Sequence, residues 1–482
     1  MLSRNRVFDL LWNNRNNYYF RMTSLYLVSA LLLVAAPSLV LGAKDYSQAL
    51  GLSNKFYEAQ RSGPINDKIV PWRGNSGMSD CTVGGWYDAG DHLKFGLPMA
   101  DSAHTLLWSL YRFKDGYTRA NQLNQMYHMI KTPLNYFKAA WDPALRRLTA
   151  QVGDGTADHA FWGRPEDMKM SRPCMYVDSS HVGSDIAGET AASLALGYLT
   201  FKQKESGYAT QLLNKAKSLY AFAKTRSGVF TGSSQYYPSG NWKDEMCLGA
   251  VWLYRATGTQ SYLNDAKSYV NLNKPWAQGW EDKMLACQLL MFEETKDAKY
   301  KNAVINFFND WATSPGAGKV DQTPCGLVWR SQWGANRYAA NAAFIALVAA
   351  EDGINAASYR KFAVEQINYI LGDNKKNAKQ CFSYEIGYGN HYPQQPHHRG
   401  SSCPSHGTCN QNANGPNPHV LLGALVGGPK VDDSYTDVRS DYIHNEVTTD
   451  YNSGFQGALA GIVHLQQRGA LPRTSNKCPC PT

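Results

Sequence analysis

Apolar residues recur at spacings of three and four between Lys44 and about Gln467, the period of helices that bury one side. Tracts rich in Gly, Pro, Asn and aromatic residues separate these segments. The pattern predicts about twelve helices, which begin near Asp45, Met99, Ala120, Val182, Tyr208, Trp242, Gln260, Gln278, Asp297, Asn336, Ala357 and Asp450. The stretch from Tyr338 to Ala350 is nearly all small and apolar, so we expect that helix to be buried on all sides.

A series of helices without convincing alternation of strands and helices predicts an all-α fold. About twelve helices is also the number needed for six hairpins that close into a double ring. A solenoid would show a fixed sequence period, and none is visible. Trp108, Trp252 and Trp311 fall within helical runs, so we assign them to the core.

Long connecting segments hold most of the unusual side chains. They are Asp67–Gly96, Thr149–Asp178, Gly228–Asn241, Lys319–Gly334 and Asn374–Asn445. Connections of this length in a compact domain are usually functional or disordered. These segments carry Trp, Tyr, His and Arg, which is not the composition of disorder, so we expect function there.

The N-terminus has the organisation of a secretory signal. Leu2–Arg21 carries several arginines, the apolar run Leu25–Leu41 follows, and Gly42-Ala43 provides a small-residue exit. A start at Met22 would leave a signal of ordinary length. The alternative is an uncleaved membrane anchor, because the run approaches the roughly 20 residues that span a bilayer. Pro37 and the small-residue exit favour cleavage, so we expect a secreted, extracellular protein.

Cysteine content indicates the compartment of the protein, and net charge limits the kinds of partner it can have. The ten cysteines fit an oxidising compartment, and Cys403 and Cys409, which bracket a short polar loop, are the predicted local pair. The remaining connectivity does not follow from sequence, and no CxxC…CxxC spacing indicates zinc. The net charge of +9 is not gathered in a Lys/Arg run, so we expect no nucleic-acid partner.

Two carboxylates stand three residues apart in the stretch Gly84–His92, among glycines and the rings of Trp86 and Tyr87. Glycine allows a sharp turn or a close approach to a ligand. Neighbouring carboxylates such as Asp88 and Asp91 raise each other's pKa and can divide acid and base duties. Because aromatic faces suit sugar rings, the stretch indicates a catalytic site for a carbohydrate.

A second carboxylate cluster lies in Tyr435–Phe455. Its defined positions are an aromatic residue, Asp437, Tyr442, Glu446, Thr448 and Asn452-Ser453. This pattern resembles the C-terminal signature of glycoside hydrolase family nine, the endoglucanase family. Tyr87–His92 resembles the family's N-terminal catalytic stretch, and Pro396–Arg399 resembles its substrate-binding His-x-Arg motif. The three blocks stand in the family's order, and the resemblance covers nearly the whole chain after the signal.

The resemblance implies an inverting β-1,4-glucanase with an (α/α)6 barrel and long functional loops on one face. In such an enzyme the two carboxyl groups stand roughly 6.5–9.5 Å apart, with room for a water between them. By resemblance Asp91 is the base, Asp88 helps to hold the water, and Glu446 is the acid. Burial against Tyr451 and nearby rings would raise the pKa of Glu446 and keep it protonated near neutrality.

The family motifs also mark Asp437 and His397. We expect Asp437 to order its loop or to tune Glu446, and His397 to donate hydrogen bonds to sugar hydroxyls; a metal site at His397-His398 lacks further ligands nearby. The predicted substrate-binding residues are His159, Tyr236, Tyr237, Trp280, Trp333, Arg337, Arg399 and Tyr451. For any single Trp, core packing is the alternative, although Trp333 and Tyr237 lie in polar loops. Glu385 and His391 depart from the family, where many members have an apolar residue and Asn.

A structural calcium ion is a further prediction, because Asp244, Glu245 and Asp282 supply hard oxygen ligands and resemble a site in some family members. The alternative is that Asp244 and Glu245 favour the first turn of a helix. Asp450 is likewise a candidate helix N-cap. No cofactor is required for the implied chemistry.

The sequence thus predicts residues 1–43 as an N-terminal extension and secretory signal, 44–470 as the catalytic domain, and 471–482 as a short Cys/Pro tail. The predicted activity is endo-β-1,4-glucan hydrolysis on cellulose or related glucans by a monomer. The alternatives are a non-hydrolytic glucan-binding protein on the same scaffold, and a glucanase anchored to a membrane through Leu25–Leu41.

Overall fold

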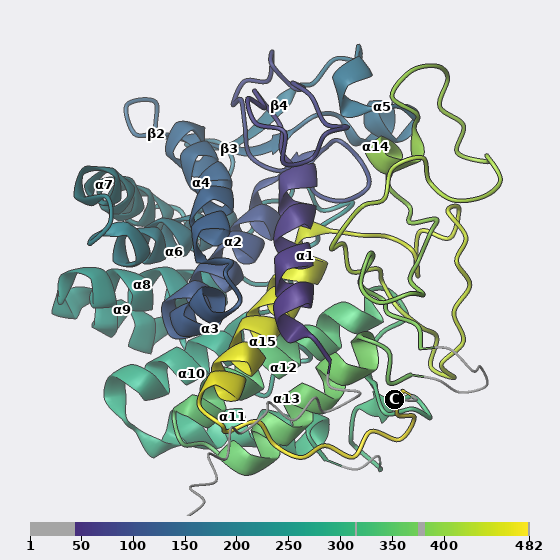
Figure 1. Cartoon of the computed structure of the whole chain (residues 1–482). Coiled ribbons are helices and arrows are strands. Elements are labelled where there is room, and N and C mark those ends of the chain that lie inside the picture. Colours follow the sequence, from purple (N-terminus) through teal and green to yellow (C-terminus); the bar gives the residue numbers. More distant parts are fainter. Residues whose placement is uncertain (1–43, 314–315, 375–380, 481–482) are drawn as a thin grey trace, which may run out of the picture. The chain divides into compact units, whose positions relative to one another are not determined.

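The computed structural model describes residues 44–313, 316–374 and 381–480 (Figure 1). Fifteen α-helices occur in these ranges, and twelve of them are long. The long helices are α1 (Tyr46–Ala59), α2 (Gly96–Arg112), α4 (Leu123–Ala140), α6 (Ser184–Phe201), α7 (Ser206–Ala223), α8 (Lys243–Thr257), α9 (Gln260–Tyr269), α10 (Met284–Thr295), α11 (Ala298–Trp311), α12 (Ala335–Glu351), α13 (Ala356–Ile370) and α15 (Thr449–Gln467). The predicted signal and apolar run lie outside the described residues.

The long helices form an inner and an outer ring. Helix α2 packs between α6 and α15, α8 joins α6 to α10, and α12 packs on α15. Each inner helix has an outer partner, as in the pairs α6–α7, α8–α9, α10–α11 and α12–α13. The fold is the (α/α)6 barrel that the sequence predicts.

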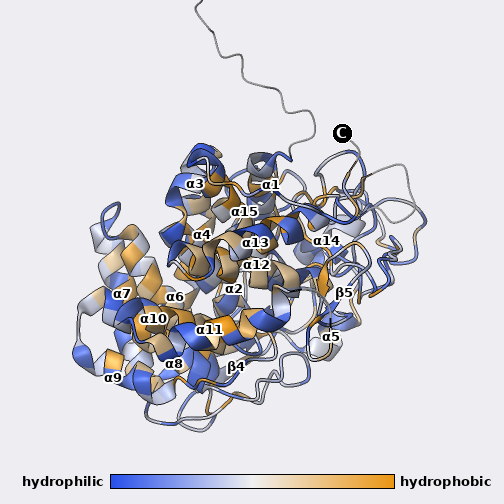
Figure 2. Cartoon of the chain, turned by 90° about the horizontal axis from the view of Figure 1, so that it is seen from below, coloured by the Kyte–Doolittle hydropathy of each residue, from blue (hydrophilic) through white to orange (hydrophobic). Residues whose placement is uncertain are grey.

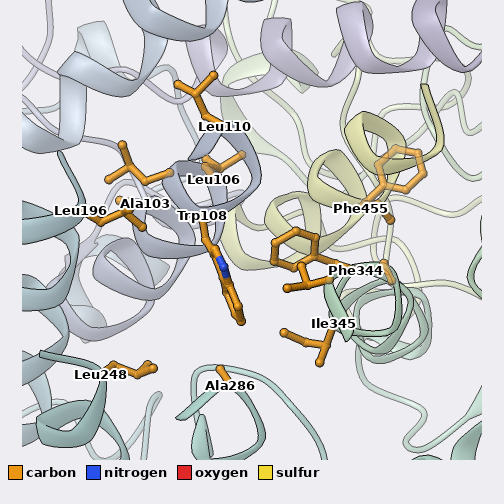
Figure 3. Close-up of a cluster of buried hydrophobic side chains, with 14 of the residues drawn as sticks. Ala103, Leu106, Trp108, Leu110, Leu196, Leu248, Ala286, Phe344, Ile345 and Phe455 are labelled. Atoms are coloured by element: carbon orange, nitrogen blue, oxygen red, sulfur yellow. The ribbon is translucent and has the colours of Figure 1, made fainter. Parts of the chain in front are cut away.

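The centre of the barrel is a cluster of large side chains from the inner helices. Figure 3 shows Trp108 of α2 pointing toward Phe344 and Ile345 of α12, with Ala286 of α10 nearby. The rings of Trp108 and Phe344 meet edge to face at 5.4 Å. Helix α12 is buried from Ala335 to Ala350, as its composition predicts. Trp108, Trp252 and Trp311 are all buried, which confirms their assignment to the core.

The outer helices bury one side only, as α7 and α11 illustrate in Figure 2, where each carries both hydrophilic and hydrophobic residues. In α11 the buried positions are Tyr300, Ala303, Val304, Phe307, Phe308 and Trp311. This spacing of three and four is the period from which the helices were predicted.

The start of α10 differs from the sequence prediction, and the candidate N-cap of α15 is wrong although that helix begins near Asp450 as predicted. Helix α10 begins at Met284 and not near Gln278, because Gly279 and Asp282 exchange backbone hydrogen bonds in a turn and the Asp282 carboxylate accepts the N–H of Met284 at 2.9 Å. Helix α15 is capped by the hydroxyl of Thr448, which accepts the N–H of Tyr451 at 3.1 Å. Asp450 therefore lies inside the first turn and is not the N-cap.

The long connections contain short elements that the periodicity did not predict. They are the helices α3 (Lys114–Arg119), α5 (Gly155–His159), η1 (Pro165–Asp167) and α14 (Arg399–Ser402), and the strands β1 (Lys94–Phe95), β2 (Trp141–Asp142), β3 (Arg147–Val152), β4 (Cys174–Val177), β5 (Asp321–Gln322) and β6 (Val328–Trp329). Strand β3 pairs antiparallel with β1, β2 and β4, with Leu148 opposite both Trp141 and Val177, and β5 pairs with β6.

The direction of the chain places the long connections together. Every passage from an outer to an inner helix is long, as in 60–95 before α2, 270–283 before α10 and 371–448 before α15. Returns from inner to outer helices are short, as in 202–205 and 296–297. Because the inner helices of an (α/α)6 barrel run in one direction, the long loops meet at the N-terminal ends of the inner helices.

All ten cysteines form disulfides, and the predicted pair Cys403–Cys409 is confirmed. The other pairs are Cys81–Cys174, Cys247–Cys287, Cys325–Cys478 and Cys381–Cys480. The last two fasten the tail to the domain. Within the described ranges, no helix has the length and apolar character to cross a bilayer.

Candidate active site

The loop that carries Asp88 and Asp91 is fixed by its backbone. Asp88 donates its N–H to the carbonyl of Leu93 at 3.0 Å, and its own carbonyl accepts the N–H of Thr449 at 2.9 Å, at the start of α15. A Cβ at Gly90 would lie 2.1 Å from the carbonyl oxygen of His397. Only glycine therefore lets this loop pack against the segment of His397.

Asp88 is buried and Asp91 is half-buried, and their pKa values shift in opposite directions. Burial, and then the negative charge of Asp91, raise the pKa of Asp88 well above its ordinary value, although its Oδ2 accepts a hydrogen bond from the hydroxyl of Tyr237. Burial would also raise the pKa of Asp91, but His159 at 3.5 Å and the charge of Arg399 outweigh it and lower this pKa. Asp91 is thus the ionised member of the pair, as a general base must be.

Glu446 has the electrostatics of a general acid. Burial raises its pKa to about 7, and Asp91 adds to the effect. Its Oε2 accepts hydrogen bonds from Nε1 of Trp333 at 2.7 Å and from the hydroxyl of Tyr451 at 3.4 Å, and these donors limit the rise. The backbone carbonyl of Glu446 accepts the N–H of Gly427 at 2.9 Å, and this hydrogen bond holds the backbone of Glu446 in place.

His397 lies beside the Glu446 segment, since its N–H donates to the carbonyl of Asn445 at 2.8 Å. Its Nδ1 donates to the carbonyl of Arg439 at 2.7 Å. Burial lowers the pKa of His397, so the ring is neutral and its single N–H is the one given to Arg439. Its Nε2 is then an acceptor, so it can accept a hydrogen bond from a sugar hydroxyl but cannot donate one, contrary to the sequence prediction. The ring meets those of Trp162 at 5.2 Å and Tyr442 at 6.1 Å.

Asp437 acts on the loop before His397. Its carboxylate accepts the N–H groups of Gln394 at 2.6 Å and Gln395 at 3.0 Å. Of the two interpretations given to Asp437, these contacts favour ordering of the loop.

Two predicted sugar-binding arginines are buried in ion pairs. Arg399 donates to Asp158 at 3.0 Å, and Arg337 donates to Asp450 at 2.9 Å. Both guanidinium groups stabilise carboxylates at the bases of the loops, while a sugar contact for either stays a prediction. Asp158 also accepts the N–H of His92 at 3.2 Å, so it anchors the Asp91 loop.

The predicted aromatic residues surround the carboxyl groups. Tyr236 packs on His159 at 5.2 Å, and Tyr237 packs on Trp280 at 4.8 Å, on the side of Asp88 and Asp91. Trp333 is 46% exposed and packs on the exposed ring of Tyr442 at 5.6 Å, on the side of Glu446. Tyr451 is buried beneath Gly334.

Sequence reasoning assigned no role to Asp158 and did not single out Trp162. Asp158 adjoins the predicted His159 in sequence, and Trp162 lies in a polar loop, the criterion that selected Trp333. Trp162 packs on His397 and donates its Nε1 to Ser402 at 3.1 Å, so that criterion would have found it.

The predicted calcium ligands do not fit a calcium ion. Glu245 pairs with the buried ammonium of Lys283 at 3.1 Å, and Asp244 accepts the N–H of Lys283 at 2.7 Å. Among the described residues, two groups of three bring their ligand atoms within 4.8 Å of one another, and neither contains Asp244, Glu245 or Asp282. Asp244 and Glu245 lie in the first turn of α8, where acidic side chains favour the helix.

The site thus combines an ionised carboxylate, a carboxyl group that titrates near neutrality, and aromatic rings on both sides of them. On an (α/α)6 barrel, this combination defines a glycoside hydrolase that uses acid and base catalysis. The pattern described as Glycosyl hydrolase family 9 matches residues 46–459. The chain belongs to this family.

Known relatives agree with this assignment. Endoglucanase A of Bacillus pumilus is 42% identical over 452 residues, which span 88% of this chain and 67% of that protein. The structure of an endoglucanase from the termite Nasutitermes takasagoensis aligns with a TM-score of 0.84 and 44% identity, over 88% of this chain and all of that one. Endoglucanase CelQ of Clostridium thermocellum, complexed with cellotriose, aligns with a TM-score of 0.80 and 35% identity, over 89% and 72% of the two chains.

Proposed function

We propose that the protein is a secreted endo-β-1,4-glucanase that hydrolyses internal bonds of cellulose and related β-glucans with inversion of configuration. The observation that carries this proposal is the contrast between Asp91, whose pKa is lowered, and Glu446, whose pKa is raised to about 7. One carboxyl group is therefore ready to accept a proton while the other still holds one. The cellotriose in CelQ supports a β-glucan substrate.

The proposed reaction follows from the two protonation states, an ionised Asp91 and a protonated Glu446. Glu446 gives its proton to the glycosidic oxygen as the bond from that oxygen to the anomeric carbon breaks. A water molecule adds to the opposite face of that carbon, and Asp91 takes the proton that the water loses. Asp88, held by Tyr237, orients the water. One water is consumed for each bond, and the new anomeric hydroxyl has the inverted configuration.

The test compares rates for Asp91→Asn and Glu446→Gln on carboxymethylcellulose and cellohexaose. We expect kcat to fall by about 10²–10⁴ in both variants, the usual contribution of a general acid or base. The control is Asp321→Asn, which changes an exposed carboxylate of β5 and should leave the rate unchanged. Undiminished activity in Asp91→Asn or Glu446→Gln would overturn the residue assignments. Cellulose binding without release of reducing sugar by the unchanged protein would instead favour a glucan-binding protein.

Export is the second part of the proposal. Five disulfides that use every cysteine support an oxidising compartment. We expect the protein in the culture medium of expressing cells to start near Lys44 and to be a monomer. N-terminal sequencing and light scattering measure both, and a protein retained in the membrane with Leu25–Leu41 intact would favour the anchored alternative.

A further inference from the structure

The polar segment that follows the Cys403–Cys409 disulfide holds four asparagines, and one of them precedes a glycine. The segment reads Asn410-Gln411-Asn412-Ala413-Asn414-Gly415-Pro416-Asn417. Asn414-Gly415 is the only Asn-Gly pair in the chain. Asparagine is a thermolabile residue, and a following glycine, which has no side chain, leaves its own backbone nitrogen open to the asparagine side chain. Nothing in the proposed reaction uses this pair.

Both members of the pair are exposed, and neither is protected by secondary structure. Among the described residues, no hydrogen bond involves the side chain of Asn414, and the N–H of Gly415 has no acceptor. A Cβ built on Gly415 would have no atom within 4 Å, so the space beside this peptide is open. The carboxamide of Asn414 is therefore free to reach the backbone nitrogen of Gly415.

The other asparagines of the segment lack this combination. Asn410 and Asn412 precede Gln and Ala, whose side chains hinder access to their backbone nitrogens. Oδ1 of Asn410 also accepts the N–H of Asn412 at 2.9 Å. Asn417 is buried and precedes Pro418, which has no N–H. The segment thus contains matched controls for a reaction that depends on the following residue.

The guanidinium of Arg439 holds the backbone on both sides of Asn414. It donates to the carbonyl of Ala413 at 2.7 Å and to that of Gly415 at 2.9 Å, and we call these two hydrogen bonds the Arg439 clamp. Arg439 is buried, and its own carbonyl accepts the Nδ1–H of His397 at 2.7 Å. A change in the backbone at Asn414 therefore acts on the residue that orients the His397 ring.

We propose that Asn414 is a site of spontaneous deamidation, and that the product loosens the Arg439 clamp behind His397. The backbone nitrogen of Gly415 attacks Cγ of Asn414 and expels ammonia, which carries away the proton that this nitrogen loses. The product is a five-membered succinimide ring. One water molecule then opens the ring at either of its carbonyl carbons, which gives Asp or iso-Asp without oxidation or reduction.

Iso-Asp is the product that disturbs the clamp. In iso-Asp the chain runs through the former side chain, so one CH₂ is added to the backbone between the carbonyls of Ala413 and Gly415. The guanidinium of Arg439 then cannot hold both carbonyls as before. Asp leaves the length of the backbone unchanged and only adds a negative charge at an exposed position.

Peptide mapping of the full chain, incubated at mildly alkaline pH, tests the modification itself. After reduction of the disulfides, trypsin cuts behind Arg399 and Lys430 and releases one peptide that contains all four asparagines. We expect a gain of one mass unit at Asn414 at least about tenfold faster than at Asn410 or Asn412. Coelution with synthetic Asp and iso-Asp peptides identifies the products. Equal rates at these positions, or no gain at Asn414, would overturn the proposal.

The activity of the deamidated protein tests the link to His397, and this part rests on the proposed function. We expect kcat/KM of the deamidated fraction on cellohexaose to fall about threefold to tenfold, the equivalent of one lost hydrogen bond. Asn414→Asp carries the same charge on an unchanged backbone and should keep the wild-type rate. Asn414→Gln should keep its rate through the same incubation. A deamidated fraction as active as Asn414→Asp, or an equal loss in Asn414→Gln, would overturn the link.

Hydrogen exchange separates this inference from the proposed function. A wild-type protein that releases no sugar would contradict the proposed glucanase, and peptide mapping would still decide on Asn414. Exchange of the segment Pro396–Arg399 would then decide on the clamp. Faster exchange in the deamidated fraction than in Asn414→Asp supports the loosened clamp, and equal exchange overturns it.

Discussion

Nε1 of Trp333 donates a 2.7 Å hydrogen bond to Oε2 of Glu446. Burial favours the protonated form of Glu446, while this donor favours the carboxylate. The two effects oppose each other and leave the pKa of the acid at about 7. The exposed ring of Trp333 therefore helps to set the pH at which the acid loses its proton.

Replacing Trp333 with Phe should extend activity to higher pH. Loss of the donor removes stabilisation of the carboxylate, so the pKa of Glu446 rises and the alkaline limb of the kcat/KM profile moves upward from about 7. The matched control is Trp329→Phe, since Trp329 donates its Nε1 to Pro429 and has no contact with Glu446. The measurement is kcat/KM on cellohexaose between pH 4 and 9 (roughly the range of carboxyl and His titration). A limb that stays in place or moves downward would contradict this account of the acid.

His159 should control the acidic limb of the kcat/KM profile. It pairs with Asp91 at 3.5 Å and lowers the pKa of that carboxyl. In His159→Ala the pKa of Asp91 rises, so the base is protonated at higher pH and the acidic limb moves upward. His181→Ala, which removes an exposed His paired with Asp178 away from these carboxyls, should leave the profile unchanged. An unmoved acidic limb in His159→Ala would mean that His159 does not tune the base.

Arg337 should contribute more to the stability of the fold than to the binding of sugar. Its ion pair with Asp450 is buried on both sides. Arg337→Met leaves Asp450 buried without its partner, which should lower the free energy of unfolding by about 3–5 kcal/mol in urea titrations. Arg468→Met breaks an exposed pair with Glu351 and should cost less than about 1 kcal/mol. Unchanged stability with a raised KM in Arg337→Met would show that the guanidinium binds substrate directly.

Glu385 should destabilise the protein as the pH rises. It is fully buried, neither carboxyl oxygen has a hydrogen-bond partner, and burial raises its pKa well above the ordinary value. A carboxyl with a raised folded pKa costs stability progressively from the unfolded pKa of about 4.3 upward, because the folded state must keep it neutral.

Glu385→Leu should therefore be more stable than the wild-type protein, by a margin that grows with pH. Glu385→Gln removes the titration but keeps the polar atoms, so it should show the same pH trend with a smaller gain. Urea unfolding at pH 5 and pH 8 (on either side of the usual stability maximum) measures both variants. A gain that does not grow with pH would contradict the buried neutral acid.

Sequence periodicity predicted the helices because burial in helices such as α11 repeats with the helical period, and the resemblance to the family predicted the barrel that they form. It missed the late start of α10, since the turn at Gly279–Asp282 depends on hydrogen bonds and not on apolar spacing. The short strands were missed for a related reason: a two-residue ladder such as that of β1 exists only when β3 lies beside it.

The candidate site likewise contains residues that sequence motifs predict and contacts that they do not predict. Motifs identified Asp91 and Glu446 by residue type and local spacing. They did not show that Arg399 pairs with Asp158, 241 positions away in sequence, or that Tyr237 donates to Asp88 across 149 positions. These contacts set the pKa values of the site, and only the folded chain brings them together.

The most direct test of the central claim is the anomeric configuration of the first products from cellohexaose, followed by proton NMR before mutarotation. If Glu446 protonates the leaving oxygen while Asp91 activates a water on the other face, the new reducing ends appear first as the α anomer. An initial β anomer would mean retention, and would contradict the assignment of Asp91 as base and Glu446 as acid.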